Sequence, residues 1–182
     1  MSCQWQTVMK LKSFTPSGKR LFETILLTML GVLMFISQVI MAPLPNIEIV
    51  SLLIIIITRS FGFKTFISVY IFVFCEVMLY GINDWVIMYM YVWAVLALAV
   101  ICIRKIDSTA VYALVSGIYG LMFGTLCSIV YFIMGGFESG IAYIIAGLRF
   151  DLYHMAGNLA AAVILYRPLT KVFSKIKSSY GL

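Results

Sequence analysis

The sequence predicts an all-α integral membrane protein, in which six transmembrane helices form a compact bundle and both termini are cytoplasmic. The composition is the first observation: 63% of residues are hydrophobic and only 11% are charged, against ~25% charged in ordinary soluble domains. The mean hydropathy of +1.07 agrees with this. The second observation is that apolar segments recur along the chain, most of them near the ~20 residues that a helix needs to cross a bilayer.

The third observation is the placement of the basic residues, which sets the orientation. Every Lys and Arg except Arg149 falls in one of four clusters, each at an end of the predicted segments. These clusters are Lys10, Lys12, Lys19 and Arg20; Arg59 and Lys64; Arg104 and Lys105; and Arg167, Lys171, Lys175 and Lys177. Because basic residues are retained on the cytoplasmic side, the clusters mark the inner ends of the helices. Acidic, amide and aromatic residues gather at the outer ends, where we expect the function to lie.

The chain divides into a cytoplasmic tail (1–19), a membrane domain (20–167) and a basic cytoplasmic tail (168–182). The six spans are expected at about 21–41, 45–60, 64–80, 85–103, 108–134 and 151–167. Pro43 and Pro45 separate the first two spans, because proline cannot continue the backbone hydrogen-bond ladder. Residues 135–150 are too short and too rich in glycine to span, and are expected to form an outer loop with a short interfacial helix, or a lid over a cavity.

Small residues at four-residue spacing, Ser116, Gly120 and Gly124, predict close approach of another helix. This stripe fits either ordinary packing within the chain or a docking surface.

Several function classes are disfavoured. The net charge of +6 lies at helix ends, where membrane headgroups account for it, so we expect no nucleic-acid partner. The four cysteines are scattered, which argues against a disulfide framework or a metal site. A single histidine without a nearby nucleophile, and the lack of H-E-x-x-H and Walker sequences, give no catalytic set.

Polar residues near the last span form the first candidate site. Asp151, His154 and Asn158 lie at i, i+3 and i+7, on one helical face, and Arg149 precedes them. Polar side chains at membrane depth are costly, so they face a cavity or partner helices. The alternative is structural: Asp151 caps the helix and pairs with Arg149, while His154 forms a hydrogen bond within the bundle.

Further candidates lie at the same outer level, where Gln38, Asn46, Glu48 and Ser51 form a second polar cluster. Asn46 and Glu48 fit ligand contact, or equally a helix cap and a favourable helix dipole. Glu76 needs a partner, which Arg149 or a ligand would supply. Trp85, Tyr89 and Trp93, spaced by four, form a stripe that suits an aromatic wall beside a planar ligand, with helix packing or an interfacial belt as the alternative.

Two segments carry a resemblance to a known family. Residues 44–53 (LPNIEIVSLL) and 150–158 (FDLYHMAGN) resemble the substrate-binding S component of energy-coupling factor (ECF) vitamin transporters, the second segment through a "FDLxHxxGN" stretch. The resemblance implies a binder in the bacterial plasma membrane that captures a vitamin outside the cell. Its implied partners are a coupling membrane protein and two ABC-type ATPases, which use ATP, so that this chain needs no cofactor. The ligand contacts it implies are Asn46, Glu48, Asn83, Asp84, Trp85, Tyr89, Tyr143, Arg149, Asp151, His154 and Asn158.

The chain departs from this family on its first helix, where members often dock through an Ala-x-x-x-Ala patch. Here the small residues are Thr28, Gly31 and Ser37. Two other readings stay open: a membrane enzyme acting on a lipid-linked substrate, with Glu76, Asp151 and His154 as acid–base groups, or a structural or regulatory subunit. The vitamin is also open, with a flavin, a pterin, a zwitterionic compound or a cobalamin each compatible.

Overall fold

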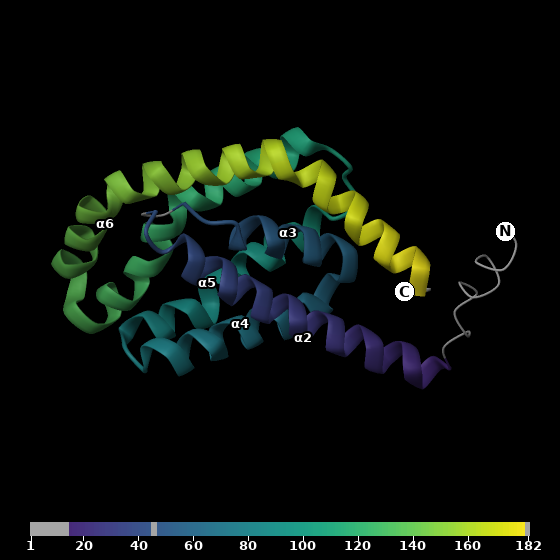
Figure 1. Cartoon of the computed structure of the whole chain (residues 1–182). Coiled ribbons are helices and arrows are strands. Elements are labelled where there is room, and N and C mark those ends of the chain that lie inside the picture. Colours follow the sequence, from purple (N-terminus) through teal and green to yellow (C-terminus); the bar gives the residue numbers. More distant parts are fainter. Residues whose placement is uncertain (1–14, 45–46, 181–182) are drawn as a thin grey trace, which may run out of the picture.

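The computed structural model describes residues 15–44 and 47–180, and in these the protein is entirely helical (Figure 1). The all-α prediction is confirmed. The elements are α2 (Pro16–Met41), α3 (Val50–Phe61), the 3-10 turn η1 (Gly62–Lys64), α4 (Thr65–Tyr80), α5 (Asp84–Ile103) and α6 (Thr109–Tyr180). Four helical segments are long and apolar enough to cross a membrane: Pro16–Met41, Val50–Tyr80, Asp84–Ile103 and Thr109–Tyr180.

Two glycines fold two of these segments back on themselves. Gly62 ends α3 with a φ of 60°, and Gly136 interrupts α6 with a φ of 76°, a left-handed conformation that glycine adopts without steric cost. Gly136 thereby divides α6 into a first arm (109–135) and a second arm (137–180), which lie side by side (Figure 1). The described residues therefore form six helical arms.

The prediction of a loop at 135–150 is wrong, because these residues are helical on both sides of Gly136. For the same reason the last helix does not begin near Asp151 but some fourteen positions earlier, and it passes through Pro168 to Tyr180. In an apolar environment every backbone polar group needs an internal partner, so a helix persists through glycines that would end it in water. Pro168 removes one backbone donor and its ring crowds the preceding turn, yet α6 continues through it.

Smaller differences occur at other helix ends. α2 begins at Pro16, before the expected Leu21, and the Oγ1 of Thr15 accepts a hydrogen bond from the backbone N–H of Gly18 at 3.1 Å. α3 begins at Val50, after the expected start at 45, and at 12 residues it measures about 18 Å.

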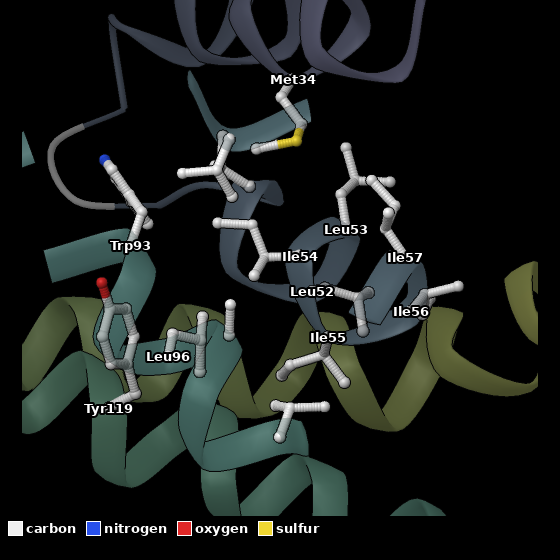
Figure 2. Packing of buried hydrophobic residues seen from close by; sticks show 14 of the residues in the cluster. Met34, Leu52, Leu53, Ile54, Ile55, Ile56, Ile57, Trp93, Leu96 and Tyr119 are labelled. Carbon is white, nitrogen blue, oxygen red and sulfur yellow. The ribbon is translucent and has the colours of Figure 1, made fainter. Parts of the chain in front are cut away.

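α3 is the centre of the bundle. All residues from Val50 to Thr58 are buried, and α2, α5 and α6 surround them. In Figure 2 the side chains of α3 interdigitate with Met34 of α2 and Leu96 of α5. The surrounding helices also expose large apolar side chains on their outer faces. Examples are Met29, Ile40, Leu98 and Val163. An apolar exterior around an apolar centre is what a lipid surrounding requires.

The small-residue stripe packs the two arms of α6 together. A Cβ on Gly120 would lie 2.8 Å from the carbonyl carbon of His154, and one on Gly124 would lie 2.5 Å from a carboxylate oxygen of Asp151. The Nδ2 of Asn158 donates to the carbonyl of Ser116 at 3.2 Å. Of the two readings of the stripe, packing within the chain is therefore confirmed.

Replacing Gly120 with alanine is expected to lower the free energy of unfolding by about 1–3 kcal/mol, because the second arm must move to admit the methyl group. The control is Gly147→Ala, since a Cβ there meets no atom within 4 Å and the residue is helical. Thermal unfolding in one detergent, followed by intrinsic fluorescence, measures both. Equal destabilisation of the two variants would contradict this packing.

The two ends of the bundle differ in chemistry. At one end Arg59 pairs with Asp107 at 3.2 Å, and the Nζ of Lys177 donates to the carbonyl of Ser60 at 2.7 Å. The start of α2 and the end of α6 lie at this end, on the right of Figure 1. The α2–α3 connection, the α4–α5 turn and the bend of α6 lie at the other end (Figure 1). Basic clusters that are far apart in the sequence thus share one end.

Candidate functional site: a polar cavity at the end opposite the basic residues

A cavity of about 290 Å³ opens at the end remote from the basic clusters. Exposed Leu44, Ile47 and Tyr80 lie at its rim. The described residues that line it are Gln38, Met41, Ala42, Leu44, Ile47, Glu48, Glu76, Tyr80, Tyr89, Trp93, Phe123 and His154. These residues come from α2, the connection before α3, α4, α5 and both arms of α6. Polar groups set among apolar and aromatic side chains are typical of a site for a small organic molecule.

Glu48 and His154 join two elements that are far apart in the chain. The Oε1 of Glu48 lies 3.1 Å from the Nε2 of His154, across a separation of 106 residues. The Oε2 of Glu48 accepts a hydrogen bond at 2.9 Å from the backbone N–H of Ser51, which caps the first turn of α3. Both side chains are buried. One residue from each of two predicted polar clusters, Glu48 before α3 and His154 on α6, therefore meet at the cavity.

Four side-chain atoms of the cavity wall are buried and have no hydrogen-bond partner among the described residues. They are Oε1 of Gln38, Oε1 of Glu76, Nε1 of Trp93 and Nδ1 of His154. Glu76 and His154 are each 3% exposed and Trp93 is 1% exposed, so bulk water does not reach them freely. An unsatisfied buried polar group lowers the stability of a protein by about 1–3 kcal/mol. Four such atoms on one wall are therefore best explained by a bound molecule that forms hydrogen bonds with them.

Aromatic rings form one side of the cavity. Tyr89 lies edge-to-face against Trp93 at a centroid distance of 5.4 Å, and Trp93 lies 5.4 Å from Phe123. The ring of Phe123 is in turn 4.9 Å from that of His154. The hydroxyl of Tyr89 accepts a hydrogen bond from the Nε2 of Gln38 at 3.2 Å. Figure 2 shows Trp93 beside Tyr119 at the edge of the apolar core, and the centroids of the two rings lie 6.0 Å apart.

Other predicted residues of the last span do not line the cavity. The carboxylate of Asp151 accepts a hydrogen bond from the backbone N–H of Gly124 at 3.0 Å, so it fastens the two arms of α6. Asp151 does not cap a helix, because the second arm begins before it. Asn158 also bonds the first arm. Arg149 is exposed, with its guanidinium over the ring of Phe150 at 5.4 Å, and forms no ion pair with Glu76 or Asp151 in the described residues.

The remaining predicted residues lie outside the lining as well. Asp84 accepts a hydrogen bond at 2.7 Å from the hydroxyl of Tyr131, whose ring stacks on Tyr143 at 4.3 Å. Asn83 is exposed in the turn before α5, and Trp85 packs edge-to-face on Tyr89. Asn46 lies outside the described residues.

The lining also includes Tyr80 and Phe123, which the predicted site omitted, and Gln38, which was predicted in the cluster with Glu48 but not among the ligand contacts. A signal for Phe123 was present in the sequence. Phe123 follows Gly120 by three positions, so the two residues lie on the same face of the first arm of α6. That face is the one that packs against the second arm.

With this geometry in view, the chain matches no protein-family model, no curated protein and no solved structure. The fold and the cavity define it as an all-helical protein with helices able to cross a membrane and a polar, aromatic-walled cavity at one end.

Proposed function

We propose that this protein is the membrane-embedded binding subunit, or S component, of an ECF-type ABC importer in the bacterial plasma membrane. It captures a vitamin or related organic micronutrient outside the cell. The observation that carries the proposal is the cavity, whose wall holds four buried polar atoms without partners. The described residues contain no group of three or more His, Cys, Asp and Glu side chains placed to hold a metal ion.

The proposed topology has six spans, one for each helical arm, and both termini in the cytoplasm. Its support is the gathering of the basic clusters at one end, since Lys and Arg favour the cytoplasmic side. The cavity then opens to the outside. A short central helix and exposed apolar faces around it suit a bundle that tilts in the bilayer. Hydrophobic mismatch between helices and lipid couples the tilt to the thickness of the membrane. We propose that this tilt carries the bound ligand inward.

The proposed partners are a coupling membrane protein and two ABC-type ATPases, which hydrolyse the ATP. Two of the three small residues named on α2 pack within the bundle: a Cβ on Gly31 would lie 2.5 Å from the carbonyl oxygen of Ser68, and Ser37 is buried. We therefore expect the coupling protein to contact a surface that does not depend on Gly31 or Ser37.

The experiment is to purify the protein in lipid nanodiscs and identify any small molecule that it releases on denaturation. The proposal expects one organic compound per chain, recovered unchanged after incubation. Turnover of a lipid-linked compound would instead establish an enzyme, and an empty cavity in the folded protein would favour a structural subunit.

Trp93→Phe is expected to weaken retention of that compound about tenfold, since the substitution keeps the aromatic packing but removes the unpartnered N–H. The matched control is Trp85→Phe, because Trp85 packs on Tyr89 outside the cavity. Isothermal titration with the recovered compound compares the two. If both variants bind as tightly as the wild type, the indole N–H of Trp93 makes no ligand contact.

A further inference from the structure

We propose that the occupant of this cavity is a small organic cation that carries N–H donors on or beside a ring. The inference deepens the proposed function, on which it rests, by naming the chemical class of the ligand.

The charge of the wall is the first argument. Glu48 and Glu76 both line the cavity, and among the described lining residues there is no Lys or Arg. With both carboxylates ionised, the wall carries two negative charges when His154 is neutral, and one negative charge, on Glu76, when His154 is protonated beside Glu48. A buried carboxylate requires a counter-charge or several hydrogen bonds. A ligand that brings a positive charge supplies the partner that an ionised Glu76 lacks.

The hydrogen-bonding character of the unpartnered atoms is the second argument. Oε1 of Gln38 and Oε1 of Glu76 are acceptors. When the Nε2–H of His154 donates to Glu48, its Nδ1 is an acceptor as well. In that tautomer only the Nε1–H of Trp93 is a donor. A ligand that satisfies the wall with neutral His154 therefore brings more donors than acceptors, as a protonated amine, an amidine or an aminated heterocyclic cation does.

The rings and the volume are the third argument. Tyr80, Tyr89, Trp93 and Phe123 supply aromatic faces and edges to the cavity, and such faces attract cations. The volume of about 290 Å³ lies at the lower end of the ~300–1,000 Å³ common for ligand pockets. It suits a compound of one or two rings and is too small for a cobalamin.

Three probes of nearly equal shape test the charge preference: benzamidinium, benzamide and benzoate. Ligand-free wild-type protein in nanodiscs is titrated with each, and the change in tryptophan fluorescence is recorded. We expect benzamidinium to bind at least tenfold more tightly than benzamide, and benzoate not to bind. Glu76→Gln should reduce benzamidinium binding at least tenfold and leave benzamide unchanged. The control Glu138→Gln alters an exposed carboxylate outside the cavity. Its affinity for each of the three probes should equal that of the wild type.

Equal or tighter binding of benzamide or benzoate would overturn the assignment, as would failure of benzamidinium to bind the folded wild-type protein. Full benzamidinium affinity in Glu76→Gln would also overturn it. The capture function is judged separately. If a neutral or anionic compound is recovered one to one from the purified protein, the capture function is supported and the assignment of a cationic ligand is wrong. If the protein binds benzamidinium selectively but turns over a substrate, the cationic ligand is supported and the assignment as an importer subunit is wrong.

Discussion

Replacing Glu76 with methionine is expected to stabilise the ligand-free protein and to weaken ligand binding strongly. In the empty cavity the Oε1 of Glu76 has no partner among the described residues, and the side chain is almost fully buried. Methionine has a similar length, suits the apolar neighbours and needs no hydrogen bond. The free energy of unfolding should therefore rise by about 1–3 kcal/mol, the cost of an unsatisfied buried polar group.

The same substitution removes the proposed counter-charge of the ligand. Truncating one partner of a buried charge pair typically costs 2–5 kcal/mol, so the affinity should fall by roughly 30-fold to several thousand-fold. Thermal unfolding without ligand and titration with ligand measure the two effects. A variant that is less stable than the wild type and binds normally would show that Glu76 supports the fold and not the ligand.

Removing either member of the Glu48–His154 pair is expected to produce the largest loss of stability, about 3–5 kcal/mol, because the remaining group is left buried without its partner. The pair connects the start of α3 to the second arm of α6, so its loss also loosens the rim of the cavity. Glu48→Leu additionally leaves the N–H of Ser51 without its acceptor.

A double-mutant cycle isolates the contribution of the pair. Glu48→Leu, His154→Leu and the double variant are unfolded under one condition, and their free energies are compared. We expect the double variant to be more stable than the sum of the single losses predicts, since no charge then remains unpaired. Strictly additive losses would mean that the two side chains do not interact energetically.

Hydropathy and glycine placement predicted most of the fold, because helices in an apolar surrounding follow directly from them. α4 and α5 lie within a residue of their expected bounds. The same surrounding explains the main error: glycines at 135–150 end helices in water, but here only Gly136 leaves the helical conformation.

The candidate site could be predicted only in part. A shared helical face identified Asp151, His154 and Asn158 as a group, but not what that face contacts. It packs on the first arm of α6, and only His154 reaches the cavity, where it meets Glu48. A pairing between residues 106 positions apart leaves no periodic signal in a single sequence. Tyr80 enters the site through the tertiary packing of α4, which the sequence did not specify.

The account depends most on the cavity facing the outside of the cell. Cysteine accessibility in intact cells tests this, in a background where Cys3, Cys75, Cys102 and Cys127 are replaced by alanine. One variant carries Leu44→Cys at the cavity rim and the other Ser179→Cys, exposed at the opposite end. We predict that a membrane-impermeant maleimide labels the first variant, and labels the second only after the cells are permeabilised. Labelling of Ser179→Cys in intact cells, with Leu44→Cys protected until permeabilisation, would contradict the orientation and the capture function built on it.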